Sequence, residues 1–421
     1  MIGRPNARVR LGRPTDFGYY WCGQTTSTFG SVLTAVAVPI VAVVYLDASP
    51  RQVSLVSAAS VAPLLVFGLP AGVLADRVRH PRRLLMVLDA VSAVAVAWIA
   101  FGVAHHVASV GWLVAFGAVE GCVTTLIEVV YLVHLRQLIP AVGIGHARAR
   151  LLAGQYAAGL AGRLLAGPII VAFGAATALL VDGVSYAVSL AALLTMTPLD
   201  ARPQRRSRAP TARPGIIQVD RFHRALMVCL IVPGAASSGV GTLTAPFLLR
   251  VLAVPTAAYG WLFAGCGVLG MAGSMLAGRL SRYSPRRITF AALAASMVCG
   301  VLLPIAAGPL PMTLICAALG ISLPVFFGAI ANVALGSVLM ADIPEDATGR
   351  VVAALQVSGA AAGLVGALVA GALGGSIGVR HAIWVLDVVA LAALVVTAPT
   401  AGRAAGRPWR AHDAGDHRHG S

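Results

Sequence analysis

Long apolar stretches, separated by short polar segments, dominate the chain. Twelve of them offer the roughly 20 mostly apolar residues that a helix needs to cross a bilayer. None alternates with a period of two in short units, which argues against an outer-membrane barrel. The pattern predicts an all-α, polytopic membrane protein with transmembrane helices over residues 19–46, 53–75, 84–104, 110–133, 149–173, 175–197, 224–249, 257–280, 288–308, 311–340, 350–373 and 379–398.

The chain also repeats itself at an offset of 204 residues. Three features recur at this spacing: Pro81-Arg82-Arg83 as Pro285-Arg286-Arg287, Ile139-Pro140 as Ile343-Pro344, and Gly167 as Gly371. Each half holds six predicted spans, so both insert in the same orientation, as in transporters built from two parallel repeats. The predicted parts are a cytoplasmic N-tail (1–18), a first six-helix half (19–198), an arginine- and proline-rich cytoplasmic linker (199–222), a second half (223–398) and a cytoplasmic C-tail (399–421).

Charge supports this topology. The chain is 58% hydrophobic, only 11% charged, and carries a net charge of +16. All 31 basic residues are arginine, and 27 of them fall on one side of the predicted spans against three on the other. This positive-inside asymmetry predicts a bacterial inner-membrane protein with both termini in the cytoplasm. Because the arginines are scattered in small clusters, we expect anionic lipid rather than nucleic acid as their partner. None of the six cysteines shows the spacing of a metal-binding motif.

The loop after the second span carries an acid followed by several arginines. Asp76 and Arg77, followed by Arg82 and Arg83, can join helix ends by charge-assisted hydrogen bonds. Together with Gly72, the loop resembles the signature loop of the major facilitator superfamily. The resemblance implies that these five residues form a conformational latch between rocking helices. The alternative is that the arginines only enforce topology.

Over residues 17–398, the chain resembles the drug:proton antiporter branch of this superfamily, which contains macrolide and siderophore exporters. Gly154, Gly167 and Pro168 match the glycine- and proline-rich motif of the fifth span in that branch, whereas Arg163 and Val171 replace expected glycines. The resemblance implies the major facilitator fold.

Ionisable residues inside the predicted spans are the candidates for proton coupling, because a charge in mid-bilayer needs a partner or a wet cavity. Glu120 and Arg163 both lie roughly 14 Å from the outer ends of their spans, at 1.5 Å per residue, so they could pair. We predict that Glu120 carries the proton and that Arg163 tunes it; a static ion pair that fixes helix register is the alternative. Glu128 is the next candidate. Asp182 is also a candidate, although it resembles a structural position bonded to neighbouring helices.

The second half lacks the corresponding charges. At the 204-residue offset, Glu120 maps to Pro324 and Arg163 to Ala367, so we expect the ionisable set to be confined to the first half. The expected division is proton handling in the first half and help with an apolar substrate in the second. Candidates for the substrate cavity are Gln24, Thr28, Phe326 and Asn332, with helix packing or lipid contact as the alternative for each.

These observations predict a secondary active transporter that works by alternating access and exports a small amphipathic compound (a drug, antibiotic or siderophore), with proton antiport as the energy source. An importer or facilitator of a polar nutrient and a transport-inactive membrane receptor are the alternatives. The chain has no metalloprotease motif, nucleophile elbow or phosphate loop, so we expect neither an enzyme nor a cofactor. The expected partners are a small-molecule substrate, protons and membrane lipid, and the chain is expected to be a monomer.

Overall fold

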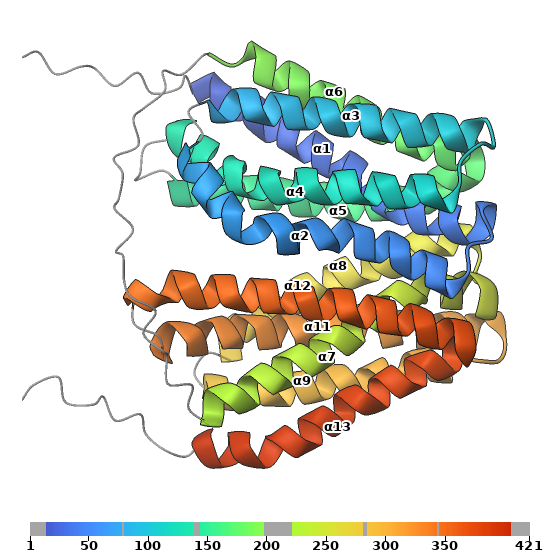
Figure 1. The fold of residues 1–421 in the computed structure, drawn as a ribbon, viewed down its shortest axis with the longest axis vertical. Coiled ribbons are helices and arrows are strands. Elements are labelled where there is room, and N and C mark those ends of the chain that lie inside the picture. The colour runs from blue at the N-terminus through green and yellow to red at the C-terminus, as the bar shows by residue number, and fades with distance from the viewer. Residues whose placement is uncertain are drawn as a thin grey trace, which may run out of the picture.

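The computed structural model describes residues 14–77, 80–138, 144–197, 221–280, 284–342 and 345–405. Within these ranges the chain is almost entirely helical and contains no strand (Figure 1). The first six helices are α1 (Pro14–Ile40) with the π-helical turn η1 (Val41–Tyr45), α2 (Pro50–Arg77), α3 (Pro81–Ala104), α4 (Val110–Leu138), α5 (Ile144–Phe173) and α6 (Ala175–Thr195). The all-α prediction is confirmed.

The remaining helices follow residues 198–220, which lie outside the described ranges. They are α7 (Arg221–Pro246) with the π-helical turn η3 (Phe247–Val251), α8 (Thr256–Leu280), α9 (Pro285–Gly300), the short α10 (Leu302–Ile305), α11 (Leu310–Asp342), α12 (Glu345–Ser376) and α13 (Val379–Ala405).

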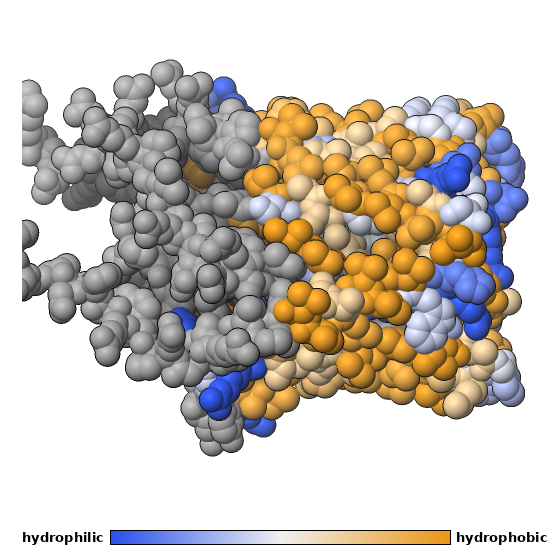
Figure 2. Space-filling view, turned by 60° about the horizontal axis from the view of Figure 1, so that its bottom comes forward, coloured by the Kyte–Doolittle hydropathy of each residue, from blue (hydrophilic) through white to orange (hydrophobic). Residues whose placement is uncertain are grey.

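Eleven segments of the described chain are long and apolar enough to cross a membrane. They match eleven of the twelve predicted spans, and the predicted span at 224–249 coincides with α7. Glycine, serine and threonine are frequent in residues 234–244 of α7, which lowers its hydropathy. Figure 2 shows the apolar belt that these helices present, with hydrophilic residues at both of its ends. The chain is therefore a multi-pass membrane protein, and the described helices are consistent with twelve crossings.

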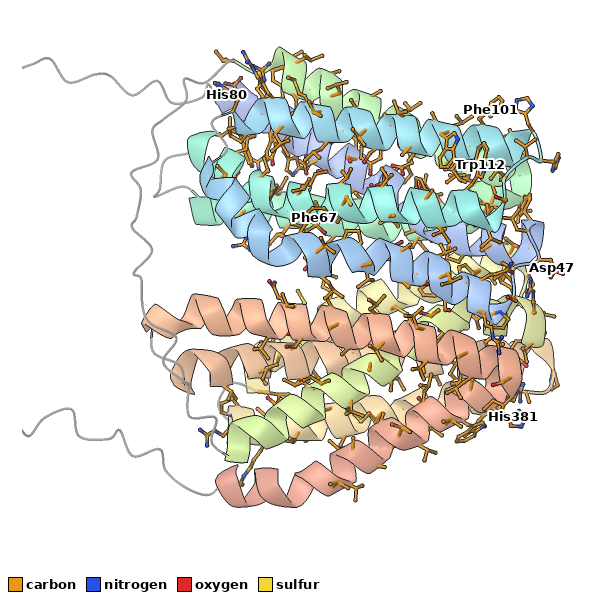
Figure 3. All side chains as sticks on the ribbon, in the orientation of Figure 1. Asp47, Phe67, His80, Phe101, Trp112 and His381 are labelled. Atoms are coloured by element: carbon orange, nitrogen blue, oxygen red, sulfur yellow. The ribbon has the colours of Figure 1, made fainter. Side chains whose placement is uncertain are left out.

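The helices form two bundles that lie side by side, α1–α6 and α7–α13 (Figure 1). Two pairs of helices make the principal contacts between the bundles, α5 with α8 and α2 with α12. We call the end where α6 stops and α7 starts the linker end, and the opposite end the far end. In Figure 3, His80 marks the linker end, and Asp47 and His381 mark the far end.

Close contacts between the bundles lie toward the far end. Gly167 of α5 packs directly on the backbone of Ala257 in α8, and Gly371 of α12 packs on Ser54 of α2. A Cβ atom at either glycine would overlap its neighbour, so only glycine permits this approach. The two glycines that mark the sequence repeat therefore occupy equivalent places at the two contacts between the bundles.

A hydrogen-bonded arginine adds to this closure. Arg250, in η3, donates from Nη1 to the carbonyl of Ala48 at 2.8 Å and from Nη2 to the carbonyl of Val43 at 2.8 Å. Its Nη2 also lies 2.6 Å from Oδ1 of Asp47. One side chain of the second bundle thus binds three groups of the first.

Candidate functional site

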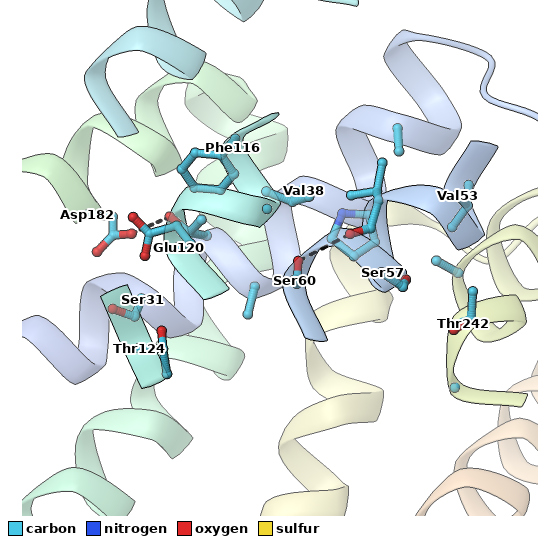
Figure 4. A pocket seen from close by; sticks show the side chains of 18 of the residues that line it. Ser31, Val38, Val53, Ser57, Ser60, Phe116, Glu120, Thr124, Asp182 and Thr242 are labelled. Carbon is cyan, nitrogen blue, oxygen red and sulfur yellow. Dashed lines mark hydrogen bonds between the residues drawn. The ribbon is translucent and has the colours of Figure 1, made fainter. Parts of the chain in front are cut away.

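A cavity of about 460 Å³ lies between the two bundles. Helices α1, α2, α4 and α6 supply most of its wall, and Gly241, Thr242, Ala245 and Tyr259 close it from the second bundle. We call it the central cavity (Figure 4). Its volume falls within the range of small-molecule sites, about 300–1,000 Å³.

Helical periodicity explains which residues face the central cavity. Ser31, Ala35 and Val38 stand four and three residues apart on one face of α1. On α4, Glu120 and Thr124 share a face in the same way, and both line the cavity. Gly117 and Gly121 flank this face, and a Cβ at either would overlap Ser60 of α2. These glycines bring α4 close to α2 and so place Glu120 at the cavity wall.

Two carboxyl groups lie on one side of the central cavity, and each has its own hydroxyl partners. Asp182 accepts from Thr34 Oγ1 at 2.5 Å and from Ser185 Oγ at 3.1 Å. The Tyr186 hydroxyl donates to Oε2 of Glu120 at 3.4 Å and lies 3.0 Å from Ser31 Oγ.

One carboxylate oxygen of this pair has unused capacity to accept a hydrogen bond. Oε1 of Glu120 is buried and has no hydrogen-bond partner within 3.5 Å, although the Ser92 hydroxyl group lies near this carboxyl group. Figure 4 shows the Glu120 and Asp182 carboxyl groups next to each other, across the cavity from Val53 and Thr242. No arginine or histidine is among the residues that line the cavity. Because two ionised carboxylates repel each other in such surroundings, a bound proton or a cationic ligand stabilises the pair.

The predicted pairing of Glu120 with Arg163 is wrong. Nη1 of Arg163 donates to the Gly159 carbonyl of its own helix at 3.3 Å, and the guanidinium lies close to Gly267 of α8. Arg163 therefore belongs to the contact between the bundles. A similar depth along two spans is necessary for pairing but not sufficient, because rotation about each helix axis decides which neighbour a side chain faces. Arg163 faces α8, whereas Glu120 faces α6.

The other candidates of the first half lie nearer the linker end. Glu128 is exposed, two turns along α4 from Glu120. Thr28 donates to the carbonyl of Gln24 at 2.8 Å, and both are half-buried. Their spacing places them on the same α1 face as Ser31, so they continue the wall of the central cavity toward the linker end without lining it.

The two candidates on α11 differ in their surroundings. Asn332 lines a second cavity, inside the second bundle. Phe326 packs against the cluster that contains Ala277, Ala292 and Ile330, and it lines neither cavity.

Of the five residues of the predicted latch, Arg82 makes side-chain contacts that the structure describes. Nε of Arg82 donates to the carbonyl of Leu193 at 2.7 Å, and Nη2 donates to that of Leu194 at 3.1 Å. Arg82 thereby ties the start of α3 to the end of α6, while Arg83 is exposed. The side chains of Asp76 and Arg77 and the surroundings of Gly72 lie outside the described part of the chain.

The sequence did not predict that a carboxyl group of the second half lines a cavity. Asp387 of α13 lines the second cavity, and its Oδ2 is buried without a hydrogen-bond partner. The expectation that ionisable residues are confined to the first half is therefore wrong. Tyr186 was also missed; its spacing of four residues from Asp182 was the available signal, because such residues share a helix face. Among the described residues, no group of three His, Cys, Asp or Glu side chains could hold a metal ion.

Comparison with known proteins places these features in a family. The family model of the Major Facilitator Superfamily matches residues 20–365. No curated protein matches the chain.

Solved structures share the fold at low sequence identity. The nucleoside transporter NupG is 11% identical, with a TM-score of 0.70 over 92% of this chain and 98% of its own. A bacterial homologue of the human lysosomal transporter Spinster, inward-facing and occupied, is 15% identical, with a TM-score of 0.70 over 92% and 96%. An inward-facing bacterial homologue of the iron transporter ferroportin is 15% identical, with a TM-score of 0.67 over 93% and 99%.

Proposed function

The chain belongs to the major facilitator superfamily, and from this premise we propose that it is a secondary active transporter that exports a small amphipathic compound in exchange for protons. The superfamily consists of transporters, which makes the central cavity between the bundles the site to explain. The finer statements, on direction, substrate and coupling ion, rest on the residues of that cavity.

The observation that carries the proposal is the acidic pair Glu120 and Asp182 at a cavity shared by both bundles. A proton-coupled exporter needs a group that takes a proton from one side and releases it when the substrate arrives. Carboxyl groups held by Thr34, Ser185 and Tyr186 hydroxyls are suited to this exchange, because the hydroxyl groups can reorient as the charge changes. A cationic or neutral amphipathic substrate fits the same walls, which are mostly apolar, whereas an anion would meet two carboxylates.

The closed end indicates which side of the membrane the central cavity faces; export remains part of the proposal. Arg250 and the two glycine contacts hold the bundles together near the far end. The arginine asymmetry of the sequence supports a cytoplasmic linker end. This arrangement favours an inward-facing conformation, in which the central cavity receives substrate from the cytoplasm. Rocking of the bundles would then expose the cavity to the outside, where protons replace the substrate.

Transport by the purified full chain in liposomes tests the proposal. An acidic interior should drive uptake of an amphipathic cation such as ethidium against its concentration gradient, and a protonophore should abolish this uptake. Erythromycin, as an antibiotic, and uridine, as a polar nutrient, serve as further substrates. Uptake of uridine alone, or uptake of ethidium that ignores the pH gradient, would overturn the proposal in favour of a nutrient facilitator. A chain that moves none of the three probes under a pH gradient counts against it too.

A further inference from the structure

The second cavity measures about 550 Å³ and lies within the second bundle, between α7, α8, α9, α11 and α13. Its walls are largely apolar, with Phe263, Leu293 and Met297 among them. Asp387 is the one charged residue among those that line it. Because Oδ2 of Asp387 is buried without a partner, this carboxyl group is in a costly position that a ligand would relieve.

The second cavity occupies the place in the second bundle that the acidic pair and its hydroxyl groups occupy in the first. Glu120 and Tyr186 correspond, 204 residues on, to Pro324 and Ala390, and both of these line the second cavity. The π-helical turns at the ends of α1 and α7 are 206 residues apart, and at that offset the α1 residues of the central cavity also correspond to lining residues of the second: Ser31 to Ser237, Ala35 to Gly241 and Val38 to Thr244. Exchange of a glutamate and a tyrosine for a proline and an alanine leaves this space unfilled.

The other polar residues that line the cavity are neutral, and several of their donors are already used: the hydroxyl groups of Thr244, Thr289 and Ser296 donate to backbone carbonyls. Gly300, the last residue of α9, lies next to Oδ1 of Asp387. Pro324 has no N–H, so the carbonyl of Gly320, four residues earlier on the cavity wall, lacks its usual helical donor. The site therefore favours a ligand that brings both hydrogen-bond donors and positive charge.

We propose that the second cavity binds an amphipathic amine, with the ammonium group on Asp387 and the hydrocarbon part against Phe263, Leu293 and Met297. The volume of about 550 Å³ and the apolar walls suit an organic amine rather than a bare metal cation, which would need a shell of oxygen ligands. Gly241 of α7 lines both cavities, so this site adjoins the central cavity across one helix. The proposal requires no proton coupling, so it can fail or stand separately from the proposed function.

Binding of a matched pair of fluorescent probes tests the site. Dansylcadaverine carries a primary ammonium group, and its N-acetyl derivative is neutral and of similar shape. Equilibrium dialysis on the purified full chain counts the sites for each probe. In a Glu120→Gln/Asp182→Asn background, which removes both central carboxylates, the ammonium probe should still bind. Adding Asp387→Asn should then weaken it at least about tenfold, the effect of losing one charge-assisted hydrogen bond, and should leave the neutral probe unchanged.

Filling the cavity provides a second measurement. Ala390→Phe places a ring where the first bundle has Tyr186 and should remove one binding site for each probe, the site in the second cavity. Val389→Phe, at the neighbouring exposed position of α13, is the matched control and should change neither affinity. Unchanged binding of the ammonium probe in both Asp387→Asn and Ala390→Phe would overturn the proposal. Binding of sodium ions that depends on Asp387, with no effect of Asp387→Asn on the amine, would also overturn it by assigning the site to an inorganic cation.

Discussion

Helices α6 and α13, each the last of its bundle, begin after glycines 204 residues apart that share one unusual conformation. Gly174 has a φ of 86° and Gly378 a φ of 88°, values that side-chain-bearing residues rarely adopt. Yet the faces that follow these glycines differ. The first bundle presents Asp182 and Tyr186 to its cavity, while the corresponding residues of the second are Leu386 and Ala390.

The same contrast recurs at the ends of the first helix of each bundle. Asp47 and Ala253 both have positive φ, at 48° and 50°, just after the π-helical turns η1 and η3. Arg250 of η3, however, corresponds to the exposed Val44 of η1. The two bundles therefore share backbone devices and differ in the side chains placed on them. We infer that the fold can keep its rocking geometry with different side chains in its two halves. The first half carries two carboxyl groups with hydroxyl partners, and the second half carries a cavity with a single carboxyl group.

The largest expected effect comes from removing the charge of Glu120. Glu120→Gln should lower proton-driven uptake in liposomes by about two orders of magnitude, the effect typical of losing a positioned proton carrier. Exchange of substrate without a pH gradient should persist, because the variant keeps the shape of the cavity. Substrate-induced proton flux, followed with a pH-sensitive dye, measures the coupling directly. Retention of full proton flux by Glu120→Gln would contradict the assignment of proton coupling to Glu120 in the first bundle.

Gly167→Ala and Gly371→Ala test the shared backbone. Each added methyl group would overlap the facing helix, and overpacking of this kind costs about 1–3 kcal/mol, or roughly 5- to 150-fold in a conformational equilibrium. Both variants should loosen the far end to a similar extent. Thr242→Cys, in a background without the native cysteines, would report this as faster labelling by a membrane-impermeant maleimide added at the far side.

Gly359→Ala is the control for this pair, because no atom lies within 4 Å of the place of its Cβ. Its labelling rate should equal that of the parent chain. A large effect at one contact glycine and none at the other would show that the two contacts between the bundles are not equivalent.

Arg250→Gln tests the asymmetric closure of the far end and should act more weakly. Two hydrogen bonds from the guanidinium to backbone carbonyls would be lost, and the partial exposure of Arg250, at 32%, limits their contribution. We expect labelling of Thr242→Cys to rise about tenfold. Asp47→Asn should have little effect, because the Asp47 side chain is 94% exposed and water screens the ion pair. Equal effects of the two variants would assign the closure to the ion pair instead.

The fold was predictable because each membrane helix can be recognised from its own stretch of sequence. The predicted spans 84–104 and 175–197 agree closely with α3 (Pro81–Ala104) and α6 (Ala175–Thr195), since a bilayer demands long apolar runs. The sequence repeat also located Gly167 and Gly371, although their common role at contacts between the bundles emerged only from the packing.

The site was predictable in its residue types and not in its pairings. Glu120 and Asp182 were found as acids within spans, but their common position at the central cavity depends on the rotation of α4 and α6, which no depth estimate supplies. The cavity role of Asp387 was missed because the repeat aligns this residue with Gly183 rather than with an acid. Asp387, one position from the counterpart of Asp182, lines the second cavity together with Ala390, the counterpart of Tyr186.

Glu128→Gln has the smallest expected effect and marks the boundary of the acidic pair. Glu128 is exposed and lies about 12 Å along α4 from Glu120 at 1.5 Å per residue, outside the wall of the central cavity. A neutral residue of the same shape should therefore change proton-driven uptake by no more than about twofold, the range of a surface charge. A loss as large as that of Glu120→Gln would instead extend the proton path along α4 toward the linker end. The contrast between the bundles would then lie in a chain of acids, Glu120 followed by Glu128, that has Pro324 and Asn332 as its counterparts.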